Sequence, residues 1–245
     1  MKAGRAAVRL SRTLWGVLAG YLTVLLRFPR LDPLQRQQEV QAWARRMLRA
    51  LDVRLEVRGA PAAGPVLQVA NHLSWLDILV LLAAGHCRFV SKADVRHWPF
   101  IGRMATGAGT LYIARESRRD AMRVVHRIAA SVQAGEVVAV FPEGATGDGR
   151  TVLPFHANLL QAAISTQSPV QPVALDFIDA ASRRRTDIPC FIGDDTLVSS
   201  AWRTITAEPL VAVVHYGPLQ AAGGRDRRAW AEELQHAVAE LRGKA

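Results

Sequence analysis

The chain alternates short strand-like runs with helix-like segments from about residue 52 onward, and this alternation constrains its fold more than any other feature. The strand-like runs are VRLEV, VLQVA, CRFVS, TLYIA, VVAVF, PVALDFI and LVAVVHY. Helix-like segments lie among them, over residues 74–84, 117–134, 156–166 and 226–242. The pattern predicts an α/β fold in which helices cover a mixed sheet and ligands bind near the carboxyl ends of strands.

The segment NHLSWLD follows the strand-like run VLQVA and places His72 and Asp77 five residues apart. Residues at this spacing do not share one face of a continuous helix, so the two side chains can meet only if a helix begins between them. Ser74 and Asp77 have the spacing of an N-terminal capping box, and the apolar run ILVLLAA follows. We therefore expect His72 in the turn before the helix and Asp77 in its first turn. An aspartate in that place can orient the imidazole as a general base.

The sequence has no G-x-S-x-G, H-E-x-x-H or Walker motif. A histidine–aspartate pair without a serine nucleophile of its own indicates that the substrate supplies the attacking hydroxyl, as in acyl transfer to an alcohol. Cys87 and Cys190 lack metal-ligand spacing and are expected to be free thiols. Two other classes stay open: a metal-dependent hydrolase with His72 and Asp77 as ligands, and a noncatalytic basic membrane-binding module.

A second cluster, FPEGATGDG, directly follows the strand-like run VVAVF and places Glu143 and Gly144 at a strand end. Its glycines permit a tight turn whose backbone N–H groups face an anion or a hydroxyl-bearing substrate. Arg103 and Arg115 lie between the two clusters. Arginine binds phosphate bidentately, so both are candidate substrate contacts.

Net charge indicates an anionic partner. The chain carries 31 Lys and Arg against 21 Asp and Glu, a formal net charge of +10. Nucleic acid, anionic lipid, a phosphorylated substrate and an acidic carrier protein all fit this charge, which alone does not choose among them.

The first 50 residues are expected to form a membrane-associated helical segment, and residues 51–245 the catalytic domain. Residues 14–26 are uncharged, but as a helix they cover only about 20 Å of a hydrocarbon core of roughly 30 Å. No small-residue cleavage site follows promptly, which favours an uncleaved anchor over a signal peptide. A basic amphipathic helix comes next, and we expect it to lie in the membrane interface rather than only pack on the domain. Its apolar residues are Val40, Trp43, Met47, Leu48 and Leu51.

Four blocks, in order, resemble the glycerophospholipid acyltransferases, the 1-acylglycerol-3-phosphate acyltransferase family. NHLSWLD is similar to that family's N-H-x-x-x-x-D motif, and PFIGRMATGAGTLYIAR, FPEG and QPVAL are similar to its second, third and fourth blocks. The resemblance implies an αβ acyltransferase domain with an N-terminal two-helix membrane-docking element. By this resemblance His72 is the general base, Asp77 orients it, and the substrate site includes Asn71, Arg103, Arg115, Glu143 and Gly144.

The implied reaction moves an acyl chain from acyl-CoA or acyl carrier protein to the free hydroxyl of lysophosphatidic acid, giving phosphatidic acid. The resemblance implies no metal or other cofactor, no nucleic-acid partner, and a place on the anionic cytoplasmic face of the inner membrane. One departure concerns the acceptor. The third block of many members continues as FPEGTRS or FPEGTTS, whereas Ala145 and Gly147 lack those hydroxyls here. Another lyso-lipid, such as lyso-ornithine lipid, is therefore the alternative acceptor.

Overall fold

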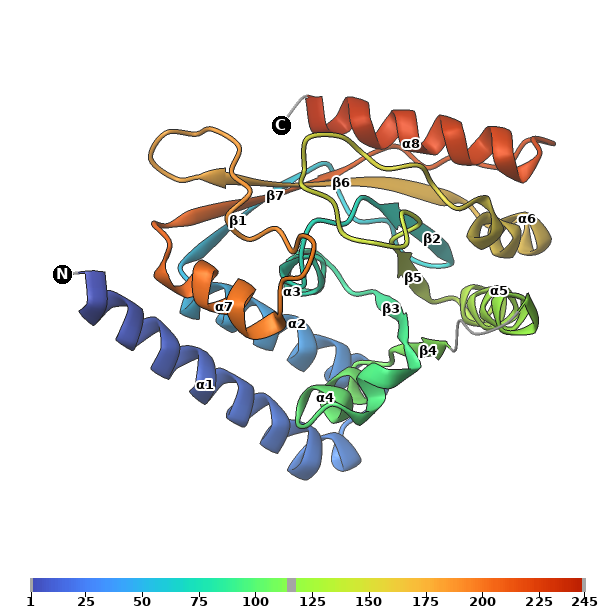
Figure 1. Ribbon diagram of the computed structural model, residues 1–245. Coiled ribbons are helices and arrows are strands. Elements are labelled where there is room, and N and C mark those ends of the chain that lie inside the picture. Colours follow the sequence, from blue (N-terminus) through green and yellow to red (C-terminus); the bar gives the residue numbers. More distant parts are fainter. Residues whose placement is uncertain (1, 114–117, 244–245) are drawn as a thin grey trace.

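Seven strands form one sheet at the centre of the computed structural model, which describes residues 2–113 and 118–243 (Figure 1). Their order across the sheet is β1-β7-β6-β2-β5-β3-β4. Only β6 and β7 pair antiparallel, whereas the other neighbours are parallel. The predicted mixed α/β sheet is thus confirmed. The strands are β1 (Val53–Arg58), β2 (Val66–Ala70), β3 (Arg88–Lys92), β4 (Leu111–Ile113), β5 (Val137–Val140), β6 (Val170–Asp179) and β7 (Leu210–Tyr216).

Helices cover both faces of the sheet (Figure 1). One layer contains α1 (Lys2–Leu26), α2 (Pro33–Ala50), α3 (Leu76–Ala84) and α7 (Leu197–Thr206), and the other contains α5 (Arg118–Gln133), α6 (Gln161–Thr166) and α8 (Arg227–Gly243). Central strands are apolar on both faces because each face meets a helical layer. In β2, for example, Val66 and Ala70 belong to the first core, and Leu67 and Val69 to the second.

Three short 3-10 helices and α4 complete the elements of the described residues. They are η1 (Phe28–Arg30), η2 (Ala93–His97), η3 (Ala157–Leu160) and α4 (Ile101–Gly107). The periodicity predicted no element at η2, α4 or α7, so the structure adds helices there. It also begins α3 at Leu76, two residues later than expected, and the predicted capping box forms only in part. The Asp77 carboxylate accepts the Ser74 N–H, but the Ser74 hydroxyl accepts the N–H of Leu76 and not that of Asp77.

The two N-terminal helices pack closely on each other. Gly16 and Gly20 permit this approach, because an added Cβ would lie 2.5 Å from the sulfur of Met47 and 2.4 Å from the indole nitrogen of Trp43. That indole donates a hydrogen bond to the carbonyl of Gly16. Met47, Leu48 and Leu51 are buried in the same core cluster as the sheet residues.

The apolar stripe of α2 therefore faces the protein core, and this corrects the expectation that it lies in a membrane interface. The exposed apolar stripe belongs instead to α1, where Trp15 is 67% exposed. Its other members are Val8, Leu14, Leu18, Leu22 and Leu26. No helix within the described residues is both long and apolar enough to span a bilayer.

Candidate active site

The His72 and Asp77 side chains meet in the turn between β2 and α3. Strand β2 ends at Ala70, and Asp77 is the second residue of α3, so the helix begins between them as predicted. The Nδ1 atom of His72 lies 2.8 Å from Oδ2 of Asp77. Asp77 is completely buried, whereas 22% of the His72 side chain is exposed. The site therefore presents imidazole to solvent and keeps the carboxylate behind it.

The contacts of Asp77 determine which nitrogen of His72 carries the proton. Its Oδ2 also accepts the backbone N–H groups of Leu73 at 2.7 Å and Ser74 at 2.9 Å. An oxygen that accepts two N–H groups meets the imidazole as an acceptor, so Nδ1 donates. In the neutral ring Nε2 then holds the free lone pair. This is the tautomer that a general base acting through Nε2 requires.

The glycine-rich loop after β5 packs against the same turn because β2 and β5 are parallel neighbours whose carboxyl ends lie side by side. The Phe141 ring stacks on the His72 ring at a centroid distance of 4.0 Å and an angle of 9°. The N–H of Gly147 donates to the His72 carbonyl at 2.9 Å. Oε1 of Glu143 accepts the His72 N–H at 3.3 Å. The stacking positions the face of the His72 ring, and the two hydrogen bonds hold the His72 backbone.

Glu143 is buried beside this turn, and its environment favours a neutral carboxyl group. Burial raises the pKa of Glu143 to about 8, and the nearby Asp77 carboxylate acts in the same direction. Backbone hydrogen bonds and Arg242 lower the pKa but do not offset the burial. A neutral carboxyl can donate as well as accept a hydrogen bond, so Glu143 differs chemically from a surface glutamate.

Asn71 has a clear structural contact. Its amide nitrogen donates to the carbonyl of Leu175 at 3.0 Å, and its amide oxygen accepts the Leu175 N–H at 2.7 Å. The side chain thereby extends the pairing of β2 with β6 by one residue and anchors the turn just before His72. Its predicted contact with substrate stays a prediction.

The other predicted substrate residues are spread over the structure. Gly144 adopts φ +73, and an added Cβ would lie 3.0 Å from the His156 ring. Arg103 is exposed on α4, which packs on α1 in Figure 1. Arg115 lies outside the described residues. The substrate-binding roles of Arg103, Arg115, Glu143 and Gly144 stay predictions.

The hydroxyl and thiol groups nearest this turn have structural partners or are buried. Ser74 Oγ donates to the Pro189 carbonyl at 2.5 Å and accepts the N–H of Leu76. Cys190 is buried, and desolvation raises the pKa of its thiol to about 12, so it stays protonated near neutral pH. Within residues 2–113 and 118–243, no cluster of His, Cys, Asp and Glu has the arrangement of a metal site.

A segment around Phe191, which no sequence motif indicated, contacts the His72 turn. The N–H of Phe191 donates to the carbonyl of Leu73, and the Phe191 carbonyl accepts from Thr146 in the glycine-rich loop. Arg203 of α7 holds this segment by donating to the carbonyls of Ile188 and Cys190. The same guanidinium binds both carboxylate oxygens of Asp195 and lowers the pKa of that group to about 2.

No sequence pattern indicated a structural role for Arg203, because an arginine in a largely polar segment is usually solvated. The structure shows that its side chain joins α7 to the segment beside the His72 turn.

A buried ion pair holds the far end of the glycine-rich loop. Arg242 of α8 donates to the Gly149 carbonyl at 2.6 Å and to Asp176 of β6 at 3.2 Å. Arg185 also contacts Asp176, at 2.5 Å. A signal for this network was present in the sequence, because Asp176 interrupts the apolar run PVALDFI. Buried carboxylates are seldom left unpaired, so this aspartate was a signal for a cationic partner, although only the fold defines the position of that partner.

The chain is similar in sequence to several known proteins. Residues 54–176 match the family model described as Acyltransferase. The lyso-ornithine lipid O-acyltransferase of Pseudomonas aeruginosa is 37% identical over 90% of this chain and 85% of that protein. The 1-acyl-sn-glycerol-3-phosphate acyltransferase of Neisseria gonorrhoeae is 36% identical over 84% of this chain and 81% of that protein.

A solved structure extends the agreement to the fold. The crystal structure of the 1-acyl-sn-glycerophosphate (LPA) acyltransferase PlsC from Thermotoga maritima superimposes with a TM-score of 0.65 and 22% identity. It covers 96% of this chain and 98% of that one, so the likeness includes the N-terminal helices. Because the family model matches residues 54–176 and relatives above 30% identity cover 84% and 90% of its length, the chain belongs to the acyltransferase family.

Proposed function

We propose that this acyltransferase moves a fatty acyl chain from a thioester donor to the free hydroxyl of a lyso-lipid. The observation that carries the proposal is the buried Asp77 carboxylate, which holds the partly exposed His72 in the tautomer of a general base. Because the chain belongs to the acyltransferase family, we no longer retain the two alternatives from other classes, the metal-dependent hydrolase and the noncatalytic membrane-binding module.

The proposed chemistry uses the substrate's own hydroxyl as the nucleophile. Nε2 of His72 accepts the hydroxyl proton while the alcohol oxygen attacks the thioester carbonyl carbon. Asp77 stabilises the imidazolium that forms. The tetrahedral intermediate then breaks its C–S bond, and the imidazolium returns the proton to the thiolate leaving group. No covalent acyl-enzyme forms, consistent with the structural partners of Ser74 and the burial of Cys190.

The donor in this proposal is acyl-CoA or acyl carrier protein. Both are anionic, and the net charge of +10 favours their approach. The positive charge does not distinguish between them.

The proposed acceptor is lysophosphatidic acid, and a second candidate is lyso-ornithine lipid. The Neisseria relative named for acylglycerol phosphate supports the first, as does Arg115, whose guanidinium suits a phosphomonoester. The Pseudomonas relative supports the second, as do Ala145 and Gly147, which lack the hydroxyls common in the third block.

The enzyme is proposed to work at the anionic cytoplasmic face of the inner membrane. The exposed apolar stripe of α1 supports this location, because a row of exposed leucines with Trp15 favours insertion into an interface. Trp98, Phe100 and Ile101 are also exposed beside α4, and Phe100 contacts Tyr21 of α1 edge to face at 5.1 Å. The exposed apolar residues at the start of α4 therefore lie beside the carboxyl end of α1.

An acyl-transfer assay with the purified enzyme tests the chemistry. His72→Ala should lower the rate by roughly 10²–10⁴-fold, the usual contribution of a general base. His236→Ala is the matched control because that histidine is exposed on α8, in the opposite helical layer. A folded His72→Ala enzyme with nearly normal turnover would contradict the proposed role.

The same assay over a panel of lyso-lipid acceptors tests the substrate. Turnover of lysophosphatidic acid above lyso-ornithine lipid is expected, and Arg115→Ala should raise the acceptor KM more than it lowers kcat. An enzyme that acylates lyso-ornithine lipid and ignores lysophosphatidic acid would instead establish the second candidate.

A further inference from the structure

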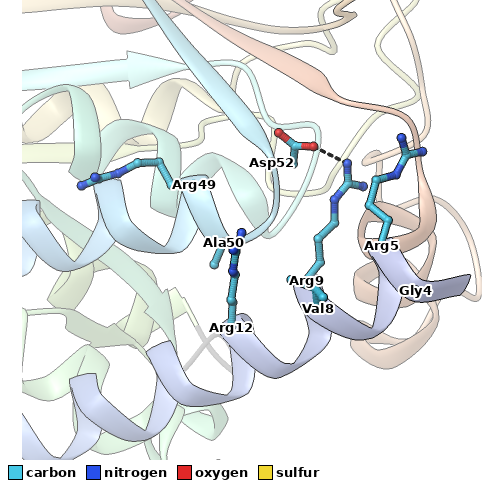
Figure 2. Close-up of a pocket in the computed structure, with 8 residues that line it drawn as sticks. All are labelled: Gly4, Arg5, Val8, Arg9, Arg12, Arg49, Ala50 and Asp52. Atoms are coloured by element: carbon cyan, nitrogen blue, oxygen red, sulfur yellow. Dashed lines mark hydrogen bonds and ion pairs between the residues drawn. The ribbon is translucent and has the colours of Figure 1, made fainter. Parts of the chain in front are cut away.

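A basic cavity lies between the first turns of α1 and the carboxyl end of α2 (Figure 2). Its volume is about 300 Å³. Four arginines and one carboxylate are among the residues that line it, namely Gly4, Arg5, Val8, Arg9, Arg12, Arg49, Ala50 and Asp52. Cationic side chains thus outnumber anionic ones at this position.

Two of the four arginines are occupied by protein groups. Arg9 is buried, donates to the carbonyls of Ile205 and Ala207, and forms an ion pair with Asp52. It therefore fastens α1 to the end of α7. Arg5 pairs with Glu208 at 2.7 Å, and both side chains are partly exposed.

The other two arginines, Arg12 and Arg49, are exposed, and neither forms an ion pair with a carboxylate in the part of the chain that the structure describes. Figure 2 shows Arg12 rising from α1 toward α2, whereas the Arg49 side chain extends along α2 away from Arg12 and donates to the Arg45 carbonyl. The cavity thus has unneutralised positive charge, which favours an anionic ligand.

The position of this charge on α1 narrows the class of ligand. Arg5 and Arg12 alternate with exposed Val8 and Trp15 at spacings of three and four residues, so a basic row runs beside the apolar row. A ligand in the cavity would have its anionic part among the arginines and an apolar part along α1. A phospholipid has this division, whereas a nucleic acid or a free phosphate has no apolar part to match.

We infer that the cavity between α1 and α2 binds the phosphate of an anionic phospholipid in the membrane surface. Arg12 makes the direct contact, Arg49 adds positive charge from α2, and the acyl chains of the lipid follow the apolar row of α1. The inference rests on the membrane location proposed above. It assigns the site to a bilayer lipid that orients the enzyme, separate from the acceptor at His72.

Vesicle binding tests the inference, with phosphatidylcholine vesicles prepared with and without phosphatidylglycerol. The double variant Arg12→Gln/Arg49→Gln should bind the anionic vesicles roughly 30-fold more weakly than the unaltered chain, since each arginine near such a surface contributes about a factor of five. Arg227→Gln/Arg228→Gln removes the same charge from exposed positions at the start of α8, in the opposite helical layer, and should bind almost normally. Equal losses in the two double variants would reveal diffuse charge attraction and overturn the site.

A second measurement separates a lipid site from a simple anion site. Titration with a short-chain phosphatidylglycerol below its micelle concentration should saturate at one lipid per chain, and the Arg12→Gln/Arg49→Gln chain should lose this binding. Inorganic phosphate at the same concentration should not displace the lipid. Displacement by phosphate, or unaltered lipid binding by the double variant, would overturn the inference.

Acyl transfer by the unaltered enzyme is measured in parallel so that the two proposals fail separately. An active enzyme that binds neutral and anionic vesicles equally well would remove the lipid site and leave the proposed function in place. A chain that binds one short-chain lipid through Arg12 and Arg49 but transfers no acyl group would do the reverse. Melting temperatures of all variants confirm that each one is folded.

Discussion

Replacing Asp77 with asparagine separates two roles that the carboxylate can have, holding the imidazole tautomer and supplying negative charge. Oδ2 accepts three N–H groups, from Leu73, Ser74 and the His72 ring. Oδ1 is buried and has no hydrogen-bond partner among the described residues. An asparagine therefore has one favourable orientation, with its oxygen in the place of Oδ2 and its NH₂ in the place of Oδ1.

This orientation preserves the tautomer and removes the charge. The amide oxygen still accepts the Nδ1 proton, so Nε2 remains free to act as the base. The imidazolium that forms during the reaction loses its anionic partner. Charges about 4 Å apart at an effective dielectric constant of about 20 interact by about 4 kcal/mol. Because each 1.4 kcal/mol or so is a factor of ten, kcat should fall by about 10³-fold.

The substitution also changes stability. The NH₂ group of the asparagine would occupy the place of the unpartnered Oδ1, and a buried donor without an acceptor costs about 1–3 kcal/mol of unfolding free energy. Asp77→Ala is the harsher change, since it leaves the N–H groups of Leu73 and Ser74 without their acceptor. The asparagine variant is therefore the better probe of catalysis.

The assay combines kcat for acyl transfer, thermal unfolding and nitrogen NMR of the His72 ring, which reports the tautomer. Asp194→Asn is the matched control, because Asp194 is exposed in the loop before α7. A folded Asp77→Asn enzyme within tenfold of normal kcat would refute the role of charge. A ring protonated at Nε2 in that variant would refute the orientation argument.

Three further predictions concern residues around the His72 turn. Folded Glu143 keeps its proton up to a pKa of about 8, whereas the unfolded residue ionises near 4.5, so its contribution to stability falls as pH rises between these values. Glu143→Gln should therefore flatten the dependence of unfolding free energy on pH in that window. Arg203→Ala should loosen the segment over His72 and lower kcat on the order of 10²-fold, with faster amide hydrogen exchange there, whereas Arg203→Lys should recover part of both. Gly144→Ala places a side chain at φ +73 and against the His156 ring, so it should lower the unfolding free energy by about 1–2 kcal/mol in denaturant titrations.

Each of these predictions has a result that contradicts it. An identical pH dependence in the Glu143→Gln protein would show that this carboxyl group titrates normally. Normal kcat in a folded Arg203→Ala enzyme would reduce the arginine to a surface contact. A Gly144→Ala protein as stable as its parent would show that the loop and His156 adjust freely.

The local sequence pattern was sufficient to predict most of the elements and the contact between His72 and Asp77. Strand-like runs such as VVAVF and LVAVVHY became β5 and β7 within a residue or so, because a strand buried on both faces is uniformly apolar. The meeting of His72 with Asp77 was also predicted, because a strand, a turn and a helix start within seven residues leave the two side chains little choice. These features depend on interactions between near neighbours in the chain.

Only the tertiary structure shows which faces of the helices pack against the rest of the protein. The apolar residues of α2 predicted an amphipathic helix correctly, but their periodicity could not distinguish a protein core from a membrane, and Met47 and Leu48 proved to be core. Arg242 pairs with Asp176, which lies 66 residues earlier in the sequence, and Arg203 binds carbonyls of the irregular segment before its own helix. An arginine has the same local pattern whether it is solvated or bound to a distant carbonyl, so only the packing of α7 and α8 reveals what these side chains hold.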